Sequence, residues 1–320
     1  MNDRLITVFG ASGFIGRYVV RALAKRGLRV LAAVRNPAAA HFLRPLGDVG
    51  QIQIVQSNVR VAPTIAKAVE GAWGVVNLVG VLRQSGAQRF HSLHIDAAGA
   101  IAAAATKAGA QSLLHVSAIG ADSASPSLYA RTKALGEAAV RAAFPKAIVA
   151  RPSIVFGPED EFFNKFAEMA RLSPVLPLFG GGKTRFQPIY AGDLGEALAR
   201  ALLDPASAAK TYELGGPRVY TFRELMEEIC RATGRKRVLL PLPYIAAQAV
   251  ALGFVFMPDF VMEPLITFDQ VKLLKIDNVV HEGMAGVRDL GLAPRALETE
   301  LPAYLWRFRK TGQFELTGAA

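Results

Sequence analysis

The chain alternates between two patterns of apolar and polar positions over its first half. Apolar runs rich in β-branched residues predict buried strands at 4–10, 28–35, 51–57, 73–80, 112–118 and 146–156. After the first run, Ile15, Val19 and Leu23 share one face of a helix-length segment whose other face is basic. An Ala-rich segment at about 96–109 predicts a further helix between the fourth and fifth strands.

Strands that alternate with helices at this spacing indicate βαβ units, whose strands form a parallel sheet covered on both faces. The rhythm changes after the sixth strand, where residues 173–188 are rich in glycine and proline. We therefore expect an α/β fold with a Rossmann-type, doubly wound parallel sheet and a smaller, mostly C-terminal α/β lobe. The larger domain is expected at 1–157, with 185–217 returning to it, and the smaller lobe at 158–184 and 218–320.

The composition is that of a globular chain with ample core material, since 52% of the 320 residues are hydrophobic and 20% are charged. The longest apolar region, at 244–258, is interrupted by Gln248 and is too short to cross a bilayer. The first strand begins close to Met1, so we expect neither a secretory signal nor a transit peptide, and hence a bacterial or mature organellar chain. Cys230 is the only cysteine, which excludes an internal disulfide and fits a reducing compartment.

The formal net charge of +11 indicates an anionic cofactor, an acidic protein partner or an anionic membrane surface. An Ala- and Arg-rich composition accounts for part of this excess. No basic run is interleaved with aromatic residues, so we do not expect nucleic acid as a partner.

Three glycines spaced three apart, Gly10, Gly13 and Gly16, lie between the first strand and the first helix. Such a pattern is weak evidence alone, but here it has the preceding strand and following helix that dinucleotide binding requires. Gly10 would permit a tight turn, Gly13 the approach of backbone to a pyrophosphate, and Gly16 the packing of helix on strand. The helix N-terminus would then offer N–H groups to the phosphates.

The second strand ends at Arg35, nineteen residues after Gly16. An acidic residue here would bind the ribose hydroxyls of NAD, whereas a guanidinium favours the 2′-phosphate of NADP. Arg17 either assists this contact or belongs to a solvated basic stripe with Arg21 and Lys25. The expected cofactor is therefore NADPH/NADP.

A candidate catalytic set follows the fifth strand. Tyr129 and Lys133 are four residues apart and share a helix face, while Ser117 ends the strand twelve residues before the tyrosine. An ammonium beside a phenol favours the phenolate and lowers the pKa of the tyrosine, which suits it to proton transfer. The serine hydroxyl could hydrogen-bond a substrate carbonyl.

The ordered motifs "FGASGFIG", Arg35, "NLVG", Ser117, "YARTK" and "RPSIVFGP" resemble those of the extended and atypical short-chain dehydrogenase/reductase family, which is NAD-dependent epimerase/dehydratase-like. The resemblance covers roughly residues 4–217. It implies that Tyr129 is the acid/base, that Lys133 binds the nicotinamide ribose and tunes the tyrosine, and that Ser117 orients the carbonyl. Phe9 is a departure, because many relatives have Thr before the first glycine.

The same resemblance implies a larger cofactor-binding set, in which two residues flank the adenine and others line the dinucleotide. Asn58 and Val59 would flank the adenine, and Leu78 to Gly80 would line the cofactor. The full set is Gly10, Ser12, Gly13, Phe14, Ile15, Gly16, Arg17, Arg35, Asn58, Val59, Leu78, Val79, Gly80, Ser117, Tyr129, Lys133, Pro152 and Ile154.

A narrower resemblance is to the NADPH-binding accessory subunit of respiratory complex I (NADH:ubiquinone oxidoreductase). It rests on the stretches 129–171, 186–194, 241–254 and 263–280, and so runs through nearly the whole chain. It implies a nucleotide held structurally, a Ser-Tyr-Lys set that does not turn over independently, and other complex I subunits as partners at the junction of peripheral arm and membrane. The implied location is peripheral, on the cytoplasmic face of the bacterial inner membrane, or on the matrix side if mitochondrial, with anionic lipid headgroups as a further contact.

Two other functions stay open on these residues. The intact Ser117, Tyr129 and Lys133 suit an active, soluble NADP-dependent reductase, epimerase or dehydratase acting on a sugar nucleotide or small carbonyl. A sensor that reads NADPH against NADP is the third alternative. For the docking function, we expect a subset of the apolar C-terminal residues to form an exposed patch; the candidates are Val250, Phe254, Met257, Leu265, Ile266 and Phe268.

Two further patterns are set aside. "GGGKT" at 180–184 ends like a phosphate-binding P-loop, but Pro177 stands where that motif needs its first glycine. His91 and His94 are three residues apart without further ligands at metal-site spacing, so no metal is expected and a hydrated surface or supporting role is favoured.

Overall fold

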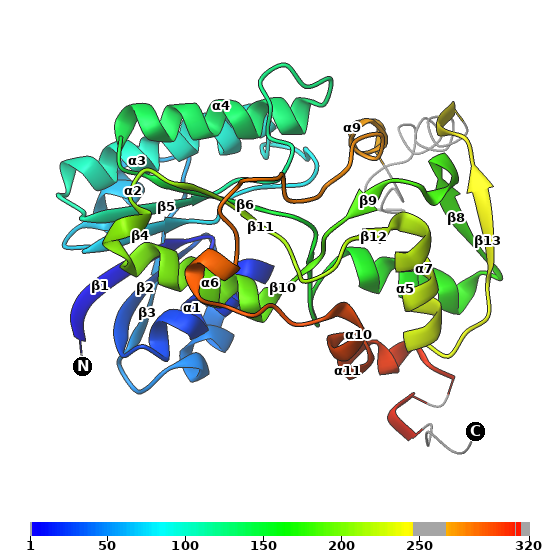
Figure 1. Ribbon diagram of the computed structural model, residues 1–320. Helices are drawn as coiled ribbons and strands as arrows, with labels where there is room; N and C mark the ends of the chain where they lie inside the picture. Colours follow the sequence, from blue (N-terminus) through cyan, green and yellow to red (C-terminus); the bar gives the residue numbers. More distant parts are fainter. Residues whose placement is uncertain (1, 246–266, 311, 315–320) are drawn as a thin grey trace. The chain divides into compact units, whose positions relative to one another are not determined.

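A computed structural model describes residues 2–245, 267–310 and 312–314 (Figure 1). The chain folds into two compact units. The first consists of Met1–Pro152, Ala191–Leu214 and Val280–Ala293, and the second of Ser153–Tyr190, Gly215–Val279 and Pro294–Ala320.

The first unit is built on a seven-stranded sheet in the order β11-β6-β5-β4-β1-β2-β3, and all neighbouring strands are parallel. Its strands are β1 (Asn2–Phe9), β2 (Leu28–Val34), β3 (Ile52–Gln56), β4 (Gly74–Asn77), β5 (Ser112–Val116), β6 (Ile148–Pro152) and β11 (Thr211–Leu214). The expected α/β fold with a Rossmann-type parallel sheet is confirmed.

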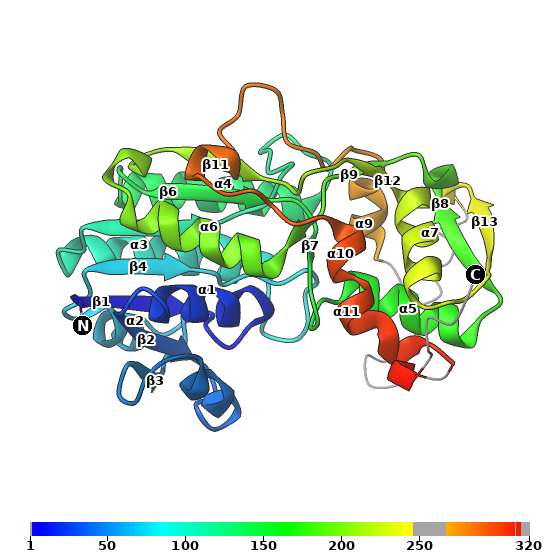
Figure 2. The same cartoon turned by 60° about the horizontal axis from the view of Figure 1, so that its bottom comes forward.

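Helices cover both faces of this sheet, as a doubly wound fold requires. On one face α1 (Phe14–Ala24) packs against α6 (Ala191–Leu203), as Figure 2 shows. Their approach is close, because a Cβ added at Gly195 would lie 2.7 Å from the backbone of Tyr18. The other face is covered by α2 (Ala62–Val69), α3 (Ala97–Lys107) and α4 (Leu128–Ala143).

The sixth predicted strand is two strands in the structure. β6 ends at Pro152, and β7 (Val155–Phe156) pairs instead with β10 (Ile189–Tyr190) in a separate two-stranded sheet. Within the segment 185–217, which was expected to return to the larger domain, β11 pairs with β6 of the main sheet.

Residues 280–293, which the sequence assigned to the smaller lobe, lie in the first unit. They are attached to the edge strand β11, since the Glu213 N–H donates to the Ala285 carbonyl at 2.9 Å. The Glu213 carboxylate also accepts from the His281 N–H at 2.9 Å and lies 2.8 Å from His281 Nδ1. These contacts join residues that are about seventy positions apart, so the apolar pattern along the chain did not reveal them.

The second unit consists of short strands and helices around an aromatic core. Its strands are β7, β10, β8 (Val175–Phe179), β9 (Arg185–Phe186), β12 (Tyr220–Thr221) and β13 (Val238–Leu242). The α-helices among its described residues are α5 (Phe162–Leu172), α7 (Phe222–Ala232), α9 (Phe268–Leu273), α10 (Leu297–Glu300) and α11 (Pro302–Leu305). Phe162, Phe166 and Phe186 each have ring centroids within 6.5 Å of Phe222, so the first residue of α7 lies inside this core.

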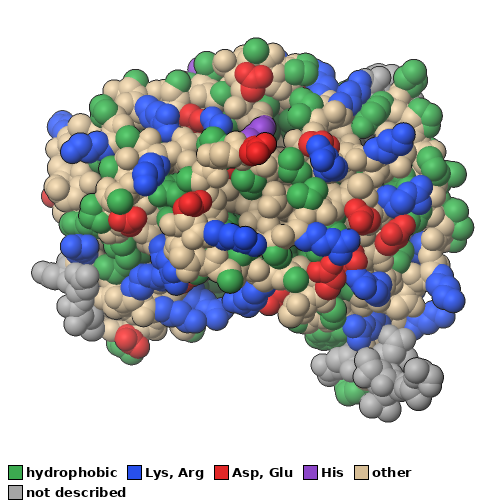
Figure 3. All heavy atoms as spheres, viewed as in Figure 1, with side chains coloured by type: hydrophobic (Ala, Val, Ile, Leu, Met, Phe, Trp, Pro, Cys, Tyr) green, Lys and Arg blue, Asp and Glu red, His purple; other side chains and the backbone are tan. Residues whose placement is uncertain are grey.

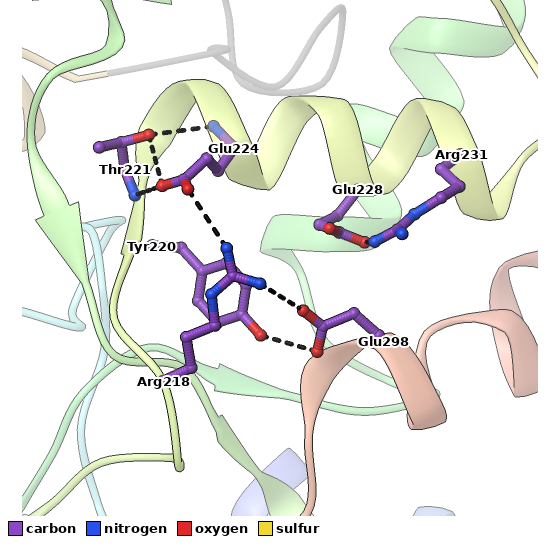
Figure 4. Close-up of polar contacts among 7 residues, drawn as sticks. All are labelled: Arg218, Tyr220, Thr221, Glu224, Glu228, Arg231 and Glu298. Atoms are coloured by element: carbon purple, nitrogen blue, oxygen red, sulfur yellow. Dashed lines mark hydrogen bonds and ion pairs between the residues drawn. The ribbon is translucent and has the colours of Figure 1, made fainter.

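A polar cluster fixes α10 to the start of α7 (Figure 4). Arg218 forms ion pairs with Glu224 at 3.3 Å and with Glu298 at 3.1 Å. The Tyr220 hydroxyl donates to the other oxygen of Glu298 at 2.8 Å, and Thr221 and Glu224 form a capping box. The second unit is thus held by reciprocal polar contacts as well as by its core.

No helix within the described ranges is both long enough and apolar enough to span a bilayer. Five candidates for the exposed apolar patch, Val250, Phe254, Met257, Leu265 and Ile266, lie outside the described residues. The sixth, Phe268, begins α9 and is 38% exposed.

Candidate nucleotide-binding site

The C-terminal ends of neighbouring strands in the first unit lie at matching positions along one edge of the sheet. Phe9 pairs with Asn77, Asn77 with His115, and Val116 with Ala150. The loops that follow β1, β4 and β5 therefore leave from neighbouring positions. In open parallel sheets this carboxyl edge is where nucleotides bind.

The glycine loop has the geometry that its spacing predicts. Gly10 has φ +78°, a conformation that favours glycine, and a Cβ there would lie 3.2 Å from the Leu78 carbonyl carbon. At Gly16 a Cβ would lie 2.3 Å from the Gly10 carbonyl oxygen and 2.5 Å from that of Ala11. Gly13 is the N-cap of α1, so the first turn of that helix opens onto the loop. This cradle, closed to any side chain, fits a pyrophosphate at the helix N-terminus.

Arg35 follows β2 with an exposed side chain. Its guanidinium makes no ion pair or hydrogen bond with any residue in the described part of the chain. Arg17 lies with its guanidinium carbon 4.7 Å from the Phe42 ring centroid, a cation–π contact. Arg35 is therefore available to an anionic ligand, whereas Arg17 is engaged with a ring.

The predicted adenine and dinucleotide contacts lie in the loops after β3 and β4. Asn58 accepts from the Arg60 N–H at 3.1 Å through its side-chain oxygen, and Val59 packs against the core beneath. Val79 packs against the same core, and its N–H donates to Asn77 Oδ1 at 3.0 Å. A Cβ at Gly80 would lie 3.7 Å from Lys133 Nζ, so this loop lies beside the candidate catalytic lysine.

Ser117 follows β5 and is 4% exposed. Its Oγ has no hydrogen-bond partner among the described residues. A buried hydroxyl without a partner is costly in a folded protein, and a bound ligand would satisfy it. Together with the glycine cradle, it makes the residues of this edge a fit for a dinucleotide.

Tyr129 and Lys133 lie on α4 as predicted, but their electrostatics differ from the expectation. Burial raises the pKa of Tyr129 to about 12, and its ring packs edge-on against Phe90 and His94 at 5.8 and 5.5 Å. Burial lowers the pKa of Lys133 to about 8, although Glu137 opposes this shift. Lys133 Nζ donates to the Val116 carbonyl at 2.8 Å. Burial of the phenol therefore opposes the lowering of the tyrosine pKa that the lysine is expected to produce.

The sequence left His94 with either a hydrated surface role or a supporting role, and the structure shows the supporting one. Its Nε2 accepts from the Val81 N–H at 3.2 Å, so the proton is on Nδ1, which lies 3.0 Å from Thr132 Oγ1. That hydroxyl in turn donates to the Tyr129 carbonyl at 3.0 Å. Burial, aided by the charge of Lys133, lowers the pKa of His94 to about 3, so the ring is neutral. His94 is thus not a hydrated surface residue; it joins the β4 loop to α4.

His115 belongs to the same buried layer. Its Nδ1 lies 3.1 Å from Asn77 Nδ2, and burial lowers its pKa well below the ordinary value. Its Nε2 has no partner among the described residues. A histidine inside the apolar strand 112–118 was the only signal for it, and nothing in the spacing joined it to Asn77.

A charged network continues from Lys133 along α4. Glu137, one turn further on, accepts two hydrogen bonds from Arg151 at 2.9 and 2.7 Å. Arg151 also lies 3.6 Å from Glu213 of β11. The lysine therefore has a carboxylate nearby that is itself fixed by an arginine of the sheet.

The remaining predicted residues divide between the units. Ser12, Phe14 and Ile15 lie in the loop and first turn of α1, and Pro152 ends β6. Ile154 belongs to the second unit and packs against its core. No cluster of three potential metal-binding side chains occurs among the residues that the structure describes.

The chain is similar to proteins of known family. A model of the NAD dependent epimerase/dehydratase family matches residues 6–215. NADH dehydrogenase (ubiquinone) 1 alpha subcomplex subunit 9, mitochondrial, of Mus musculus is 36% identical over 304 residues, which are 95% of this chain and 80% of that protein. A ceramide reductase of Caulobacter vibrioides is 32% identical over 75% of this chain and 74% of its own length.

Among solved structures, an NADPH-dependent quinone oxidoreductase from Escherichia coli complexed with NADPH superposes with a TM-score of 0.73 at 22% identity. The match covers 93% of this chain and 99% of that one, and at this identity it shows the fold alone. The expected resemblance is confirmed by the sequence matches. The chain belongs to the NAD dependent epimerase/dehydratase family, and its homology to the alpha subcomplex subunit 9 proteins extends over 95% of its length.

Proposed function

We propose that this chain is an NADP(H)-binding accessory subunit of respiratory complex I, which holds its nucleotide mainly as a structural ligand. The observation that carries the proposal is the extent of its homology. The match to the mouse alpha subcomplex subunit 9 protein spans 95% of the chain, whereas the epimerase/dehydratase match ends at residue 215. Residues beyond the family's common region are thus shared with a protein named as part of NADH dehydrogenase.

The nucleotide would be held by the carboxyl edge of the sheet. Gly10, Gly13 and the first turn of α1 would bind the pyrophosphate, and Arg35 would bind the 2′-phosphate that distinguishes NADP from NAD. Ser117 Oγ and Lys133 Nζ lie deeper and would bind the nicotinamide half. NADPH is a hydride donor, so hydride transfer is the chemistry that it would supply at this site if an acceptor reached it.

The tyrosine supports retention of the nucleotide more than turnover. A general acid or base works best with a pKa near the working pH, whereas burial raises the pKa of Tyr129 to about 12. Lys133, the group that would lower it, donates to the Val116 carbonyl. A tightly bound ligand stabilises the fold by about 2.7 kcal/mol at a hundredfold excess over its Kd.

Association with other complex I subunits would place the chain peripherally at the inner membrane, where the peripheral arm meets the bilayer. We propose the cytoplasmic face for a bacterial chain and the matrix side for a mitochondrial one. The net charge of +11 suits contact with acidic partners or anionic headgroups there.

The test is native purification of the chain from its own membranes, with mass spectrometry of the proteins and nucleotide that come with it. Complex I subunits and NADPH at about one per chain are the expected result. A chain that emerges alone and exchanges its nucleotide freely would contradict the proposal.

A reductase that turns over is the second candidate. Its support is the unpartnered, buried Ser117 Oγ near the candidate acid/base pair, together with the similarity to the ceramide reductase over 75% of the chain. An active reductase would oxidise NADPH in the presence of a carbonyl substrate, and its activity would depend on Tyr129.

A further inference from the structure

A shallow groove lies in the second unit, where α7 ends and the chain turns towards β13. It has a volume of about 530 Å³ and is lined by Arg231, Arg235, Lys236 and Arg237, with Glu227 as the acidic side chain among its described lining. Leu239 adds apolar surface. Basic groups gathered on so small a surface repel one another where no anion lies between them.

The backbone at the end of α7 fixes where these side chains start. Gly234 has φ +62°, the Gly234 N–H donates to the Arg231 carbonyl at 3.1 Å, and the Arg235 N–H donates to the Cys230 carbonyl at 2.9 Å. This is the hydrogen-bond pattern of a Schellman turn, which ends a helix sharply. The three consecutive basic residues therefore follow directly from a rigid turn.

Two of the guanidinium groups are anchored by main-chain carbonyls, Arg235 through one nitrogen and Arg237 through two, the second being Nη1, which donates to the Lys236 carbonyl at 3.0 Å. Arg235 Nε donates to the Phe308 carbonyl at 2.9 Å, and Arg237 Nε donates to the Ala170 carbonyl at 2.6 Å. Arg235, Lys236 and Arg237 have no carboxylate partner among the residues that the structure describes. Arg231 differs, because Glu228 pairs with it (Figure 4). The groove thus holds oriented cations whose charge the protein does not neutralise, an arrangement that lowers the entropy cost of binding an anion.

An apolar sheet face adjoins the groove. β13 pairs with β8 so that Val238 lies beside Val175 and Leu240 beside Pro177, all on one face. Val238 is 62% exposed and Leu240 is 47% exposed, and Leu172, just before β8, is 73% exposed. In Figure 3, apolar and basic side chains lie interspersed along the edge where Figure 1 shows β13.

We propose that this basic groove and the adjoining face of β8 and β13 form a surface that binds an anionic phospholipid bilayer. Lipid phosphates would lie among Arg235, Lys236 and Arg237, and Val238 and Leu240 would meet the boundary of the acyl chains. A basic surface with large apolar side chains beside it is the combination that anionic membranes bind. The inference rests on the proposed position beside the inner membrane and names the surface that makes the contact.

The test is co-sedimentation of the full chain with vesicles of phosphatidylcholine alone and of an equimolar mixture with phosphatidylglycerol. We expect binding to the mixed vesicles only, and weaker binding as salt rises. Lys236→Gln should weaken this binding about fivefold, the effect of one basic side chain near an anionic surface. Lys107→Gln, the same change at an exposed lysine that ends α3 in the first unit, is the matched control and should have no effect.

The apolar part of the surface is tested by Leu240→Thr, which keeps a strand-forming residue at an exposed position. We expect weaker vesicle binding with unchanged NADPH binding, and the latter also reports that the chain is folded. Equal vesicle binding by the Lys236→Gln, Leu240→Thr and control chains would overturn the proposal. So would displacement of the chain from vesicles by millimolar inorganic phosphate, which would indicate a site for free phosphate. If the chain co-purifies with complex I subunits but does not bind the vesicles, the proposed function stands and only this inference is overturned.

Discussion

Lys133 Nζ donates to the main-chain carbonyl of Val116 at 2.8 Å, which ties the lysine of α4 to the last residue of β5, directly before Ser117. The charged group also lies beside the loop after β4, since a Cβ at Gly80 would be 3.7 Å from Lys133 Nζ. The same hydrogen bond explains why the lysine ammonium does not lower the pKa of Tyr129. Burial, and not the neighbouring ammonium, decides the pKa of Tyr129.

The buried lysine makes stability depend on pH in the alkaline range. Burial lowers the pKa of Lys133 from 10.5 to about 8, so the unfolded chain binds more protons than the folded chain between these values. The penalty is full below pH 8 and decreases as the pH rises from 8 to 10.5, where the unfolded lysine also loses its proton. From pH 8 to pH 10 the free energy of unfolding should therefore gain about 2 kcal/mol from this group. Urea unfolding of the nucleotide-free chain measures it.

The control for the lysine is a pair of variants. Lys133→Met should lose this gain, whereas Lys107→Met on the exposed end of α3 should retain it. An identical rise from pH 8 to pH 10 in both variants would contradict the lowered pKa of Lys133, because it would show that the folded chain keeps this lysine charged without cost.

His94 should make the fold sensitive to acid. Because burial lowers the pKa of His94 to about 3, the unfolded chain binds a proton that the folded chain excludes between pH 6.5 and pH 3. The stability is fully present above pH 6.5 and is lost as the pH falls. His94→Gln should lose about 2 kcal/mol less than the wild type between pH 7 and pH 4.5. Thermal unfolding at both pH values measures the difference.

His91→Gln is the matched control, since His91 lies three residues away on the surface beside Asp96. It should keep the acid sensitivity of the wild type. The same loss of stability in His91→Gln, His94→Gln and the wild type would contradict a buried, neutral His94.

Gly16 should tolerate no side chain. A Cβ there would lie 2.3 Å from the Gly10 carbonyl oxygen, so Gly16→Ala must move the backbone of the nucleotide loop. We expect NADPH binding to weaken at least about tenfold and stability to fall by about 1–3 kcal/mol, as overpacking does elsewhere. Calorimetric titration and thermal unfolding check the two effects.

Gly99→Ala provides the comparison within a helix. Its Cβ would lie 3.4 Å from the Ala139 Cβ, which is ordinary contact, and alanine favours helix by roughly 0.5–1 kcal/mol over glycine. This variant should bind NADPH like the wild type. Equal behaviour of the two variants would mean that the glycine loop relaxes without cost.

Arg35 should decide between NADPH and NADH. Arg35→Asp removes the guanidinium available to a 2′-phosphate and places a carboxylate near the ribose hydroxyls. We expect the affinity for NADPH to fall at least about tenfold, the size of one charge-assisted hydrogen bond, while the affinity for NADH is kept or raised. Lys107→Asp should change neither Kd, and an unchanged Kd for NADPH in Arg35→Asp would contradict the assignment.

Tyr129 should separate retention from turnover. Tyr129→Phe removes only the hydroxyl and keeps the ring that packs against Phe90 and His94. A structural subunit should keep its NADPH and its complex I partners in this variant. Loss of NADPH oxidation by at least about a hundredfold, with binding intact, would instead support the reductase.

Much of the first unit could be predicted because its determinants are local. The strands before Gly10 and Arg35 are short apolar runs, and the glycine spacing between strand and helix has one common use. Consecutive βαβ units also have a preferred hand, which leaves few ways to order parallel strands. The sheet and the position of Ser117, Tyr129 and Lys133 followed from such signals.

The buried polar layer could not be predicted in the same way. His94, His115 and Asn77 come from two strand ends and a helix, and only the register of β4 and β5 brings Asn77 to His115. Pairings across tens of residues have no periodic signature, so nothing in the sequence indicated that Asn77 contacts His115.

The sequence by itself thus determined the parallel α/β sheet, the glycine loop at its edge and the residue types that favour NADP. Periodicity and spacing carry this information because neighbouring residues share one element. Only the tertiary structure decided the protonation of Tyr129, Lys133 and His94, since burial depends on what other elements cover a side chain. It also decided that residues 280–293 form hydrogen bonds with Glu213, because such long-range bonds form only after the sheet has brought their partners together.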